Sequence, residues 1–183
     1  MRIEKTDLID CFIIKPRVFK DERGSFMETF RQNIIEEVIG HKVDFVQDNQ
    51  STSQYGSIRG LHFQIGDKSQ AKLVRVVKGE VLDVVVDLRP DSPTFKQTFS
   101  YRLSDQNNHQ LFVPKGFAHG FSCLSKEVIF AYKCDAYYNQ EAERGIYFAD
   151  KDLDIDWQIP DNEQIVSEKD TANPSLIEFL EQV

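Results

Sequence analysis

Long apolar segments are missing from this sequence. No apolar run approaches the roughly 20 residues that cross a bilayer, and residues 1–7 lack the apolar centre of a secretion signal. Basic residues are also in deficit, because 22 Lys and Arg stand against 30 Asp and Glu, which leaves a net charge of −8. Phosphate polymers repel a chain of this charge. We therefore expect a cytoplasmic protein that binds neither membranes nor nucleic acid.

Cysteine is scarce as well. The three cysteines, Cys11, Cys123 and Cys134, stand singly among apolar or aromatic neighbours, and no CxxC pair occurs. An odd number of cysteines without a secretion signal indicates reduced thiols. We expect these thiols to be buried in the core rather than joined in disulfides.

Alternation with a period of two dominates the chain. In residues 81–88, Leu82, Val84 and Val86 share one face, as in a largely buried strand. Similar runs lie at 11–19, 43–48, 72–77, 95–103, 110–113, 117–124 and 127–134. Turn-forming residues separate these runs, and the length fits one domain over residues 1–183. Short strands at this spacing predict an all-β sandwich or jelly-roll barrel.

Helical periodicity is confined to two short stretches. Residues 30–40 carry four aliphatic side chains on one side, and residues 174–182 begin at Pro174, a residue favoured in a first helical turn. We expect two or three short helices at the periphery of the β fold.

Arg59, His62 and Lys72 lie on two adjoining runs that otherwise carry core residues. Charged groups on inward strand positions are costly unless something pairs with them, so their presence indicates a polar cavity. Arg59 and His62 have opposite parity along their strand. Both can enter one cavity only if the chain bends near Gly60, where a bulge is permitted.

Strand parity also directs Lys72 and Tyr132 inward. Lys72 shares a face with Val74, and Tyr132 shares a face with Phe130. Taken singly, an inward Tyr or His is more often a satisfied core residue, and a Lys at a strand end extends to water. Their convergence in one chain favours a functional site.

Residues 114–121 contain a Pro-x-Gly turn followed by His119 on a strand. This segment resembles the second motif of the cupin superfamily, small β-barrels whose mouth holds a metal or an organic ligand. The first cupin motif offers His-x-His and then Glu, whereas this chain has His62-x-Gln64, with Lys72 nearby. Two histidines and a neutral Gln beside an ammonium are a poor metal site. We therefore expect a cupin-type jelly roll without a metal.

A closer resemblance covers nearly the whole chain. The segments that carry it are 19–26, 47–51, 58–64, 72–76, 79–84, 114–121, 132–134 and 167–170, together with Asp150, Ile155 and Trp157. In these segments the chain is similar to the dTDP-4-dehydrorhamnose 3,5-epimerase family. The resemblance implies a homodimer that works without a metal or any other cofactor. It also implies inversion of the two carbons beside the ketone of a dTDP-4-keto-6-deoxyhexose, the third step of dTDP-L-rhamnose synthesis for bacterial cell-surface polysaccharides such as lipopolysaccharide.

The resemblance assigns four catalytic residues. His62 is the base that removes a proton beside the ketone, and Asp170 orients it and balances its charge. Lys72 stabilises the enolate oxygen. Tyr132, on another strand, returns the proton to the opposite face of the ring.

The resemblance also assigns a second group, which holds the nucleotide sugar. Its members are Arg23, Glu28, Gln47, Asn49, Arg59, His119, Tyr138, Glu143 and Lys169. Three of these are cations suited to the pyrophosphate, and Tyr138 is assigned to stack on thymine.

Two other functions stay open on the sequence. One is an enzyme that epimerises a single centre, or a ketoisomerase, acting on the same kind of dTDP sugar. The other is a metal-dependent cupin oxygenase or a cupin binding module.

Overall fold

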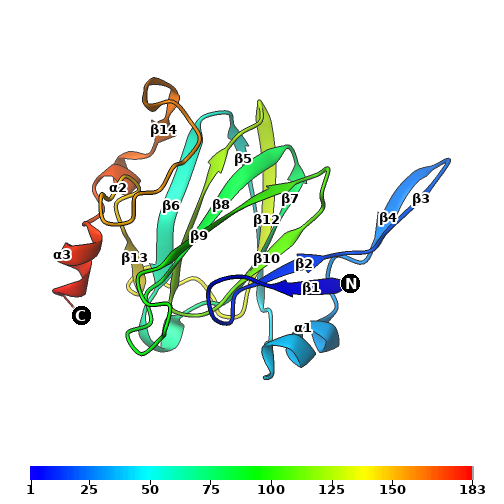
Figure 1. Ribbon diagram of the computed structural model, residues 1–183, viewed down its shortest axis with the longest axis horizontal. Coiled ribbons are helices and arrows are strands. Elements are labelled where there is room, and N and C mark those ends of the chain that lie inside the picture. Colours follow the sequence, from blue (N-terminus) through cyan, green and yellow to red (C-terminus); the bar gives the residue numbers. More distant parts are fainter. Residues whose placement is uncertain (183) are drawn as a thin grey trace.

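Two sheets face each other across an apolar core in the computed structural model, which describes residues 1–182 (Figure 1). The first sheet runs in the order β1 (Arg2–Lys5), β2 (Phe12–Lys15), β10 (Gln110–Val113), β7 (Lys72–Lys78), β12 (Glu127–Cys134) and β5 (Gln47–Gln54). The second runs in the order β13 (Glu143–Gly145), β6 (Ser57–Gln64), β11 (Phe117–Cys123), β8 (Glu80–Asp87) and β9 (Thr98–Ser104). A short strand, β14 (Ile165–Val166), pairs in parallel with β6. This arrangement confirms the predicted all-β jelly-roll fold.

The outer face of each sheet is covered by a different part of the chain. Helix α1 (Gln32–Ile39) buries Ile35 against the first sheet, next to Phe12 and Phe112. The C-terminal segment covers the second sheet with Phe148, Trp157 and other apolar residues. This segment contains α2 (Glu168–Thr171) and α3 (Leu176–Leu180). Two single-turn 3-10 helices, η1 (Gly66–Lys68) and η2 (Asp161–Glu163), lie in connecting loops.

Three sequence predictions differ from the structure. The run at 11–19 is two strands, because Pro16 cannot donate a hydrogen bond to a ladder and β2 ends before it. The run at 43–48 is a coil until Gln47, where β5 begins; β5 is polar on both faces and so shows no apolar alternation. The last helix begins at Leu176 rather than Pro174, since Ser175 forms a capping box with Glu178.

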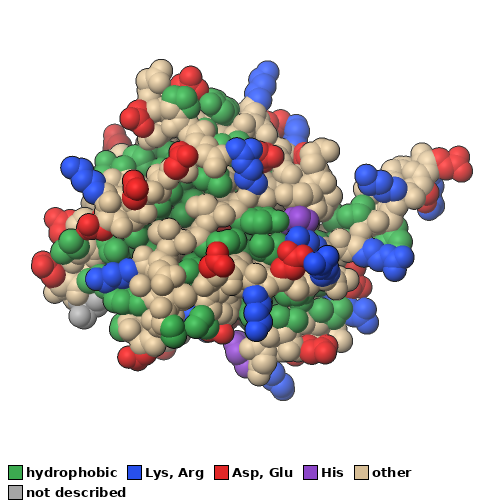
Figure 2. Space-filling model, viewed as in Figure 1, with side chains coloured by type: hydrophobic (Ala, Val, Ile, Leu, Met, Phe, Trp, Pro, Cys, Tyr) green, Lys and Arg blue, Asp and Glu red, His purple; other side chains and the backbone are tan. Residues whose placement is uncertain are grey.

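A hairpin of β3 (Val18–Asp21) and β4 (Gly24–Met27) projects from the body of the molecule (Figure 1). Phe19 and Phe26 pair across it, although they are 50% and 71% exposed. Figure 2 shows basic and acidic side chains along this arm. An isolated two-stranded hairpin is at best marginally stable in water, and exposed aromatic residues are typical of a contact surface.

No helix in residues 1–182 is both long and apolar enough to cross a bilayer.

Candidate active site

A pocket of about 740 Å³ opens between the two sheets. Strands β5, β7 and β12 of the first sheet form one wall, and β6 and β11 of the second sheet form the other. Helix α2 and strand β14 close one side with Asp170, Lys169 and Val166. The pocket is therefore built from segments that are far apart in the sequence.

A bulge in β6 places Arg59 and His62 in the same pocket. His62 pairs with His119 and Arg59 with Phe121, so two residues of β6 lie opposite the single residue Gly120. Gly60 has a φ of +117°, and a Cβ atom there would lie 2.6 Å from the Cα of Gly120. Only glycine fits this close approach of two backbones. The predicted bend near Gly60 is confirmed.

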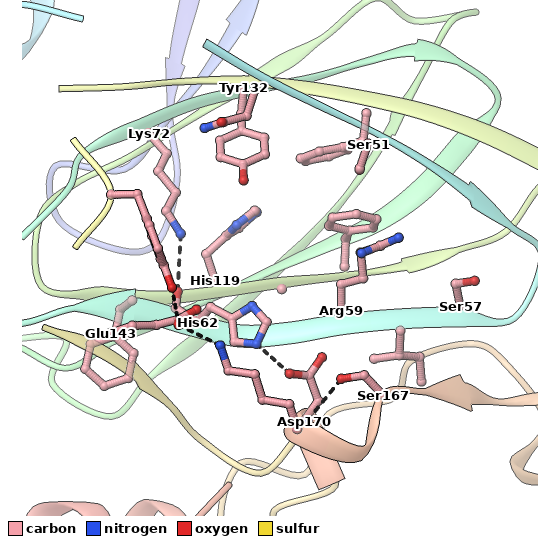
Figure 3. A pocket seen from close by; sticks show the side chains of 18 of the residues that line it. Ser51, Ser57, Arg59, His62, Lys72, His119, Tyr132, Glu143, Ser167 and Asp170 are labelled. Carbon is pink, nitrogen blue, oxygen red and sulfur yellow. Dashed lines mark hydrogen bonds and ion pairs between the residues drawn. The ribbon is translucent and has the colours of Figure 1, made fainter. Parts of the chain in front are cut away.

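His62 and Asp170 form a close pair at the floor of the pocket in Figure 3. Their Nε2 and Oδ1 atoms lie 2.6 Å apart, and the other carboxylate oxygen accepts the Gly60 N–H at 3.3 Å. Ser167 caps α2 and accepts a hydrogen bond from the Asp170 N–H, which fixes the position of the carboxylate. The second ring nitrogen of His62, Nδ1, faces the pocket (Figure 3).

The charge of Asp170 fixes the tautomer of His62. Burial acts to raise the pKa of the Asp170 carboxyl, but the hydrogen bond and charge of His62 outweigh burial and lower it below its usual value. An ionised Asp170 accepts a proton-bearing Nε2, which leaves a lone pair on Nδ1. The pair can therefore take up a proton from a ligand in the pocket.

Lys72 and Tyr132 approach from the opposite wall. Lys72 is 9% exposed, and its Nζ donates to the backbone oxygen of His62 at 3.3 Å. Tyr132 extends from β12 with its hydroxyl directed into the pocket, toward the His62 side (Figure 3). Burial lowers the pKa of the Lys72 ammonium and raises the pKa of the Tyr132 phenol. Tyr132 therefore keeps its proton at neutral pH and can donate it.

A second histidine–carboxylate pair joins the pocket wall to the core: His119 lines the pocket, and its partner Asp83 lies behind it. The Nε2 atom of His119 lies 3.1 and 2.9 Å from the two oxygens of Asp83, and the ring stacks on Phe130. Both members of the pair are buried. Asp83 was not predicted as a site residue. One feature of the sequence could have identified it. Asp83 alternates with Val81 and Val85 on one face of a core strand, and a buried carboxylate requires a partner.

The rim of the pocket is held together by polar contacts around Glu143. Its Oε2 accepts hydrogen bonds from the Tyr138 hydroxyl at 2.9 Å and from the Lys169 ammonium at 2.6 Å. The Tyr138 N–H donates to Gln47 at 2.8 Å, and the Gln47 amide donates to Asn49 at 3.1 Å. The rim therefore joins β5, β13 and α2 through side chains that can also bind a ligand.

Eleven of the thirteen predicted site residues line this pocket. The two others, Arg23 and Glu28, do not reach it in their own chain. Arg23 lies at the turn of the projecting hairpin, 2.6 Å from Asp21, and Glu28 follows the hairpin, 3.8 Å from Arg31. Both side chains are exposed, so their predicted contact with a ligand requires another molecule to receive the arm.

The pocket is richer in cations than the chain as a whole. Arg59, Lys72 and Lys169 line it, although the chain carries a net charge of −8. Arg59 donates from Nε to Ser53 at 2.9 Å, which leaves its outer guanidinium nitrogens available. A pocket of this kind favours an anionic ligand of small-molecule size.

Residues 1–182 contain no group of three or more His, Cys, Asp or Glu side chains that could hold a metal ion. Gln64, the residue in place of the second histidine of the cupin motif, donates to the backbone oxygen of Lys68 and accepts from the Asn139 N–H. The Gln64 amide is therefore used in hydrogen bonds to backbone groups of neighbouring loops.

Comparison with known proteins places the chain in a family. Residues 5–178 match the family model described as dTDP-4-dehydrorhamnose 3,5-epimerase. The chain is 47% identical over 178 residues to the dTDP-4-dehydrorhamnose 3,5-epimerase of Shigella flexneri, with 97% of each chain covered. The crystal structure of the enzyme of this name from Elizabethkingia anophelis is 50% identical, with a TM-score of 0.94 over 97% of each chain.

A second similar structure contains a sugar nucleotide. It is the dTDP-6-deoxy-D-glucose-3,5-epimerase of Legionella pneumophila in complex with dTDP-4-keto-L-rhamnose. It is 46% identical, with a TM-score of 0.92 over 96% of this chain and 93% of that one. The match of the family model and the agreement in sequence and structure over nearly the full length lead to one conclusion: this chain belongs to the dTDP-4-dehydrorhamnose 3,5-epimerase family.

Proposed function

We propose that this chain inverts C-3 and C-5 of dTDP-4-dehydro-6-deoxy-D-glucose to give dTDP-4-dehydro-L-rhamnose, the reaction of its family. The observation that carries the proposal is the placement of His62 and Tyr132 on opposite walls of one pocket, with Lys72 beside them. Inversion of a carbon needs a base on one face of the ring and an acid on the other.

The reaction begins with the hydrogen on a carbon beside the ketone. The Nδ1 atom of His62 takes this proton, and the electron pair of the broken C–H bond moves to the ketone oxygen to form an enolate. Asp170 stabilises the imidazolium that results. The ammonium of Lys72 stabilises the enolate oxygen, a contribution of about 3–4 kcal/mol if it acts as other oxyanion donors do.

The second half of the reaction delivers a proton to the other face of the ring. The Tyr132 hydroxyl faces the pocket from β12 and donates its proton to the enolate carbon, which restores the ketone with inverted configuration. The tyrosinate then regains a proton by way of solvent, and His62 releases its own. The same four residues serve both centres when the ring presents each carbon in turn.

The rest of the pocket suits the nucleotide. Arg59 and Lys169 supply positive charge for the pyrophosphate, and the Tyr138 ring, which is 54% exposed at the rim, offers a face for thymine. Lys169 and Tyr138 both bind Glu143. A ligand that uses these two side chains exchanges their contacts with Glu143 for contacts of its own.

Arg23 and Glu28 enter this proposal through a homodimer. The hairpin that carries Arg23 projects from its own chain and exposes Phe19 and Phe26, so a second copy is the natural receiver of the arm. We expect Arg23→Ala and His62→Ala to be inactive separately. When the two variants are mixed, each hybrid dimer then contains one intact pocket, and activity returns. Mixing that restores nothing would place Arg23 in its own subunit or outside the site.

Proton NMR of the reaction in D₂O tests the function. Deuterium should enter at C-3 and C-5, and the L-sugar should appear. Exchange at only one position would identify a single-site epimerase, and movement of the carbonyl would identify a ketoisomerase. Tyr132→Phe separates the two proton transfers: His62 still removes and returns a proton on one face, so exchange persists while inversion collapses. Equal loss of both in this variant would contradict the assignment of Tyr132 as the acid.

A further inference from the structure

Asp83 is a buried carboxyl group with a single hydrogen-bonding partner. Its side chain is fully buried on the inner face of β8, and its oxygens accept from one group, the Nε2–H of His119. No other donor contacts this carboxylate within residues 1–182. An ionised carboxylate has about four acceptor sites, and one N–H offsets only a small part of the free energy needed to remove the carboxylate from water.

Lys72 is a buried ammonium group that lacks acceptors and a counter-charge. Its ammonium is buried, has three donor hydrogens, and makes one hydrogen bond, to the backbone oxygen of His62. It forms no ion pair with any carboxylate in the part of the chain that the structure describes. A buried cation without a counter-charge releases its proton instead.

The two groups come from facing sheets. Lys72 begins β7 in the first sheet, and Asp83 lies in the middle of β8 in the second. Burial raises the pKa of the Asp83 carboxyl, and the nearby His119 and Lys72 act against that rise. Burial lowers the pKa of the Lys72 ammonium, and Asp83 is among the groups that act against that fall. Lys72 and His119 line the same pocket, and His119 binds Asp83, so the two groups belong to one cluster. When both groups are ionised, each opposes the loss of charge that burial favours in the other.

Other groups around Lys72 are less suited to balance it. The titratable side chains that face it from neighbouring elements are His62 of β6, Asp83 of β8, His119 of β11, Tyr132 and Cys134 of β12, and Glu143 of β13. Burial raises the pKa of the Cys134 thiol to about 11, so it is neutral at neutral pH. Glu143 is already bound by Lys169 and Tyr138. Asp83 is the carboxylate that remains.

We propose that Asp83 is the buried counter-charge of Lys72 and a positioning residue for the reaction. It keeps Lys72 in the ammonium form that stabilises the enolate, and it holds the His119 ring in one orientation. This inference rests on the proposed function, because it assigns Asp83 through the role of Lys72 in that reaction.

The pH dependence of proton exchange tests this role. We expect the exchange rate at saturating substrate to fall at alkaline pH as Lys72 loses its proton. Asp83→Asn keeps an acceptor for His119 but removes the charge, so this alkaline limb should move to lower pH by roughly one unit or more. At neutral pH the exchange rate should fall by up to roughly tenfold for each unit by which the limb moves below that pH. Exchange is measured rather than inversion because it does not require Tyr132.

A matched control lies on the same strand. Asp87 is also fully buried, but it binds Arg89, Ser92 and Thr94 away from the pocket. Asp87→Asn should lower the unfolding temperature and leave the alkaline limb where the unsubstituted chain has it. Asp83→Ser, which also removes the charge and leaves room for a water, replaces Asp83→Asn if that variant does not fold.

The outcomes separate the two proposals. Turnover by the unsubstituted chain, together with an unshifted limb in a folded Asp83 variant, overturns the role of Asp83 and leaves the proposed function standing. Absence of turnover by the unsubstituted chain overturns the proposed function and this inference together. A limb that shifts in the Asp83 variant and not in Asp87→Asn supports both.

Discussion

Two histidine–aspartate pairs lie at the same pocket and differ in how far a ligand can reach them: His62, Asp170 and His119 line it, and Asp83 lies behind His119. The His62 side chain is 32% exposed and its Asp170 partner 5%, whereas His119 and Asp83 are 7% and 0% exposed. The hydrogen bonds and charge of His62 lower the pKa of Asp170 despite burial, but burial prevails at Asp83 and raises its pKa. Two pairs of the same composition therefore shift the pKa of their aspartates in opposite directions.

The difference also follows from where each carboxylate lies in the fold. Asp170 sits in the short helix α2, after a chain excursion of 108 residues from His62, and reaches the pocket from its edge. Asp83 lies inside β8, where its neighbours Phe121 and Tyr101 fix its register. A pair at the edge leaves the second ring nitrogen open to a ligand, and a pair inside the sheet holds its imidazole and carboxyl in fixed positions. We infer proton transfer for the first and positioning for the second.

His62→Ala, which removes the exposed pair, should have the largest effect on activity. Without the imidazole no group remains to take the proton, so both deuterium exchange and inversion should be lost. Binding of dTDP should survive, because the cations of the pocket are untouched. The measurement is NMR in D₂O together with calorimetric titration of dTDP. Undiminished deuterium uptake by the variant would remove His62 from the role of base.

Lys72→Met should have the next largest effect. The enolate would lose its stabilising charge, so exchange and inversion should fall together by roughly 10²–10³-fold. The side chain of Met fills most of the same volume, so the variant should fold. Thermal unfolding should nevertheless show lower stability, because Asp83 loses the cation that balances it. A loss of inversion with exchange intact would move Lys72 from the enolate to the reprotonation step.

The sequence was enough to predict the fold class and the family, and both are confirmed. Strand parity also anticipated the bend at Gly60 and the inward direction of Lys72 and Tyr132. It could not anticipate how α2 brings Asp170 to His62, because a four-residue helix has no periodicity and its contact spans most of the chain. The assignment of Asp170 depended on resemblance.

Other parts of the site were hidden from sequence patterns for different reasons. Strand β5 is polar on both faces, because it forms a pocket wall and an edge of the sheet, so apolar alternation did not reveal its bounds. Asp83 was missed, because the alternation in residues 81–88 directed attention to Leu82, Val84 and Val86, and only the structure places Asp83 against His119. The location of Arg23 on a projecting arm depends on tertiary structure, and its contact with a ligand stays a prediction.

His119→Asn sharpens the comparison with a smaller effect. If the buried pair positions rather than transfers protons, this variant should raise KM by roughly tenfold while exchange and inversion keep their ratio. Asn can retain one hydrogen bond to Asp83, which limits the loss of stability. Steady-state kinetics and the NMR assay measure the two quantities. A selective loss of exchange, equal to that of His62→Ala, would give the buried pair a role in proton removal.

Removal of metal ions should have the smallest effect of all. A metal shared by His62 and His119 would give the two pairs one common role and abolish the distinction between them. Each imidazole already directs its Nε2 to a carboxylate, and Gln64 binds backbone groups outside the pocket centre. Lys72 lines the same pocket as these side chains and would repel a cation. We therefore expect unchanged kcat after prolonged treatment with a chelator, measured beside a sample to which divalent ions have been returned. Loss of activity that one divalent ion restores would support the metal-dependent cupin alternative, and would make the two histidines ligands of one site.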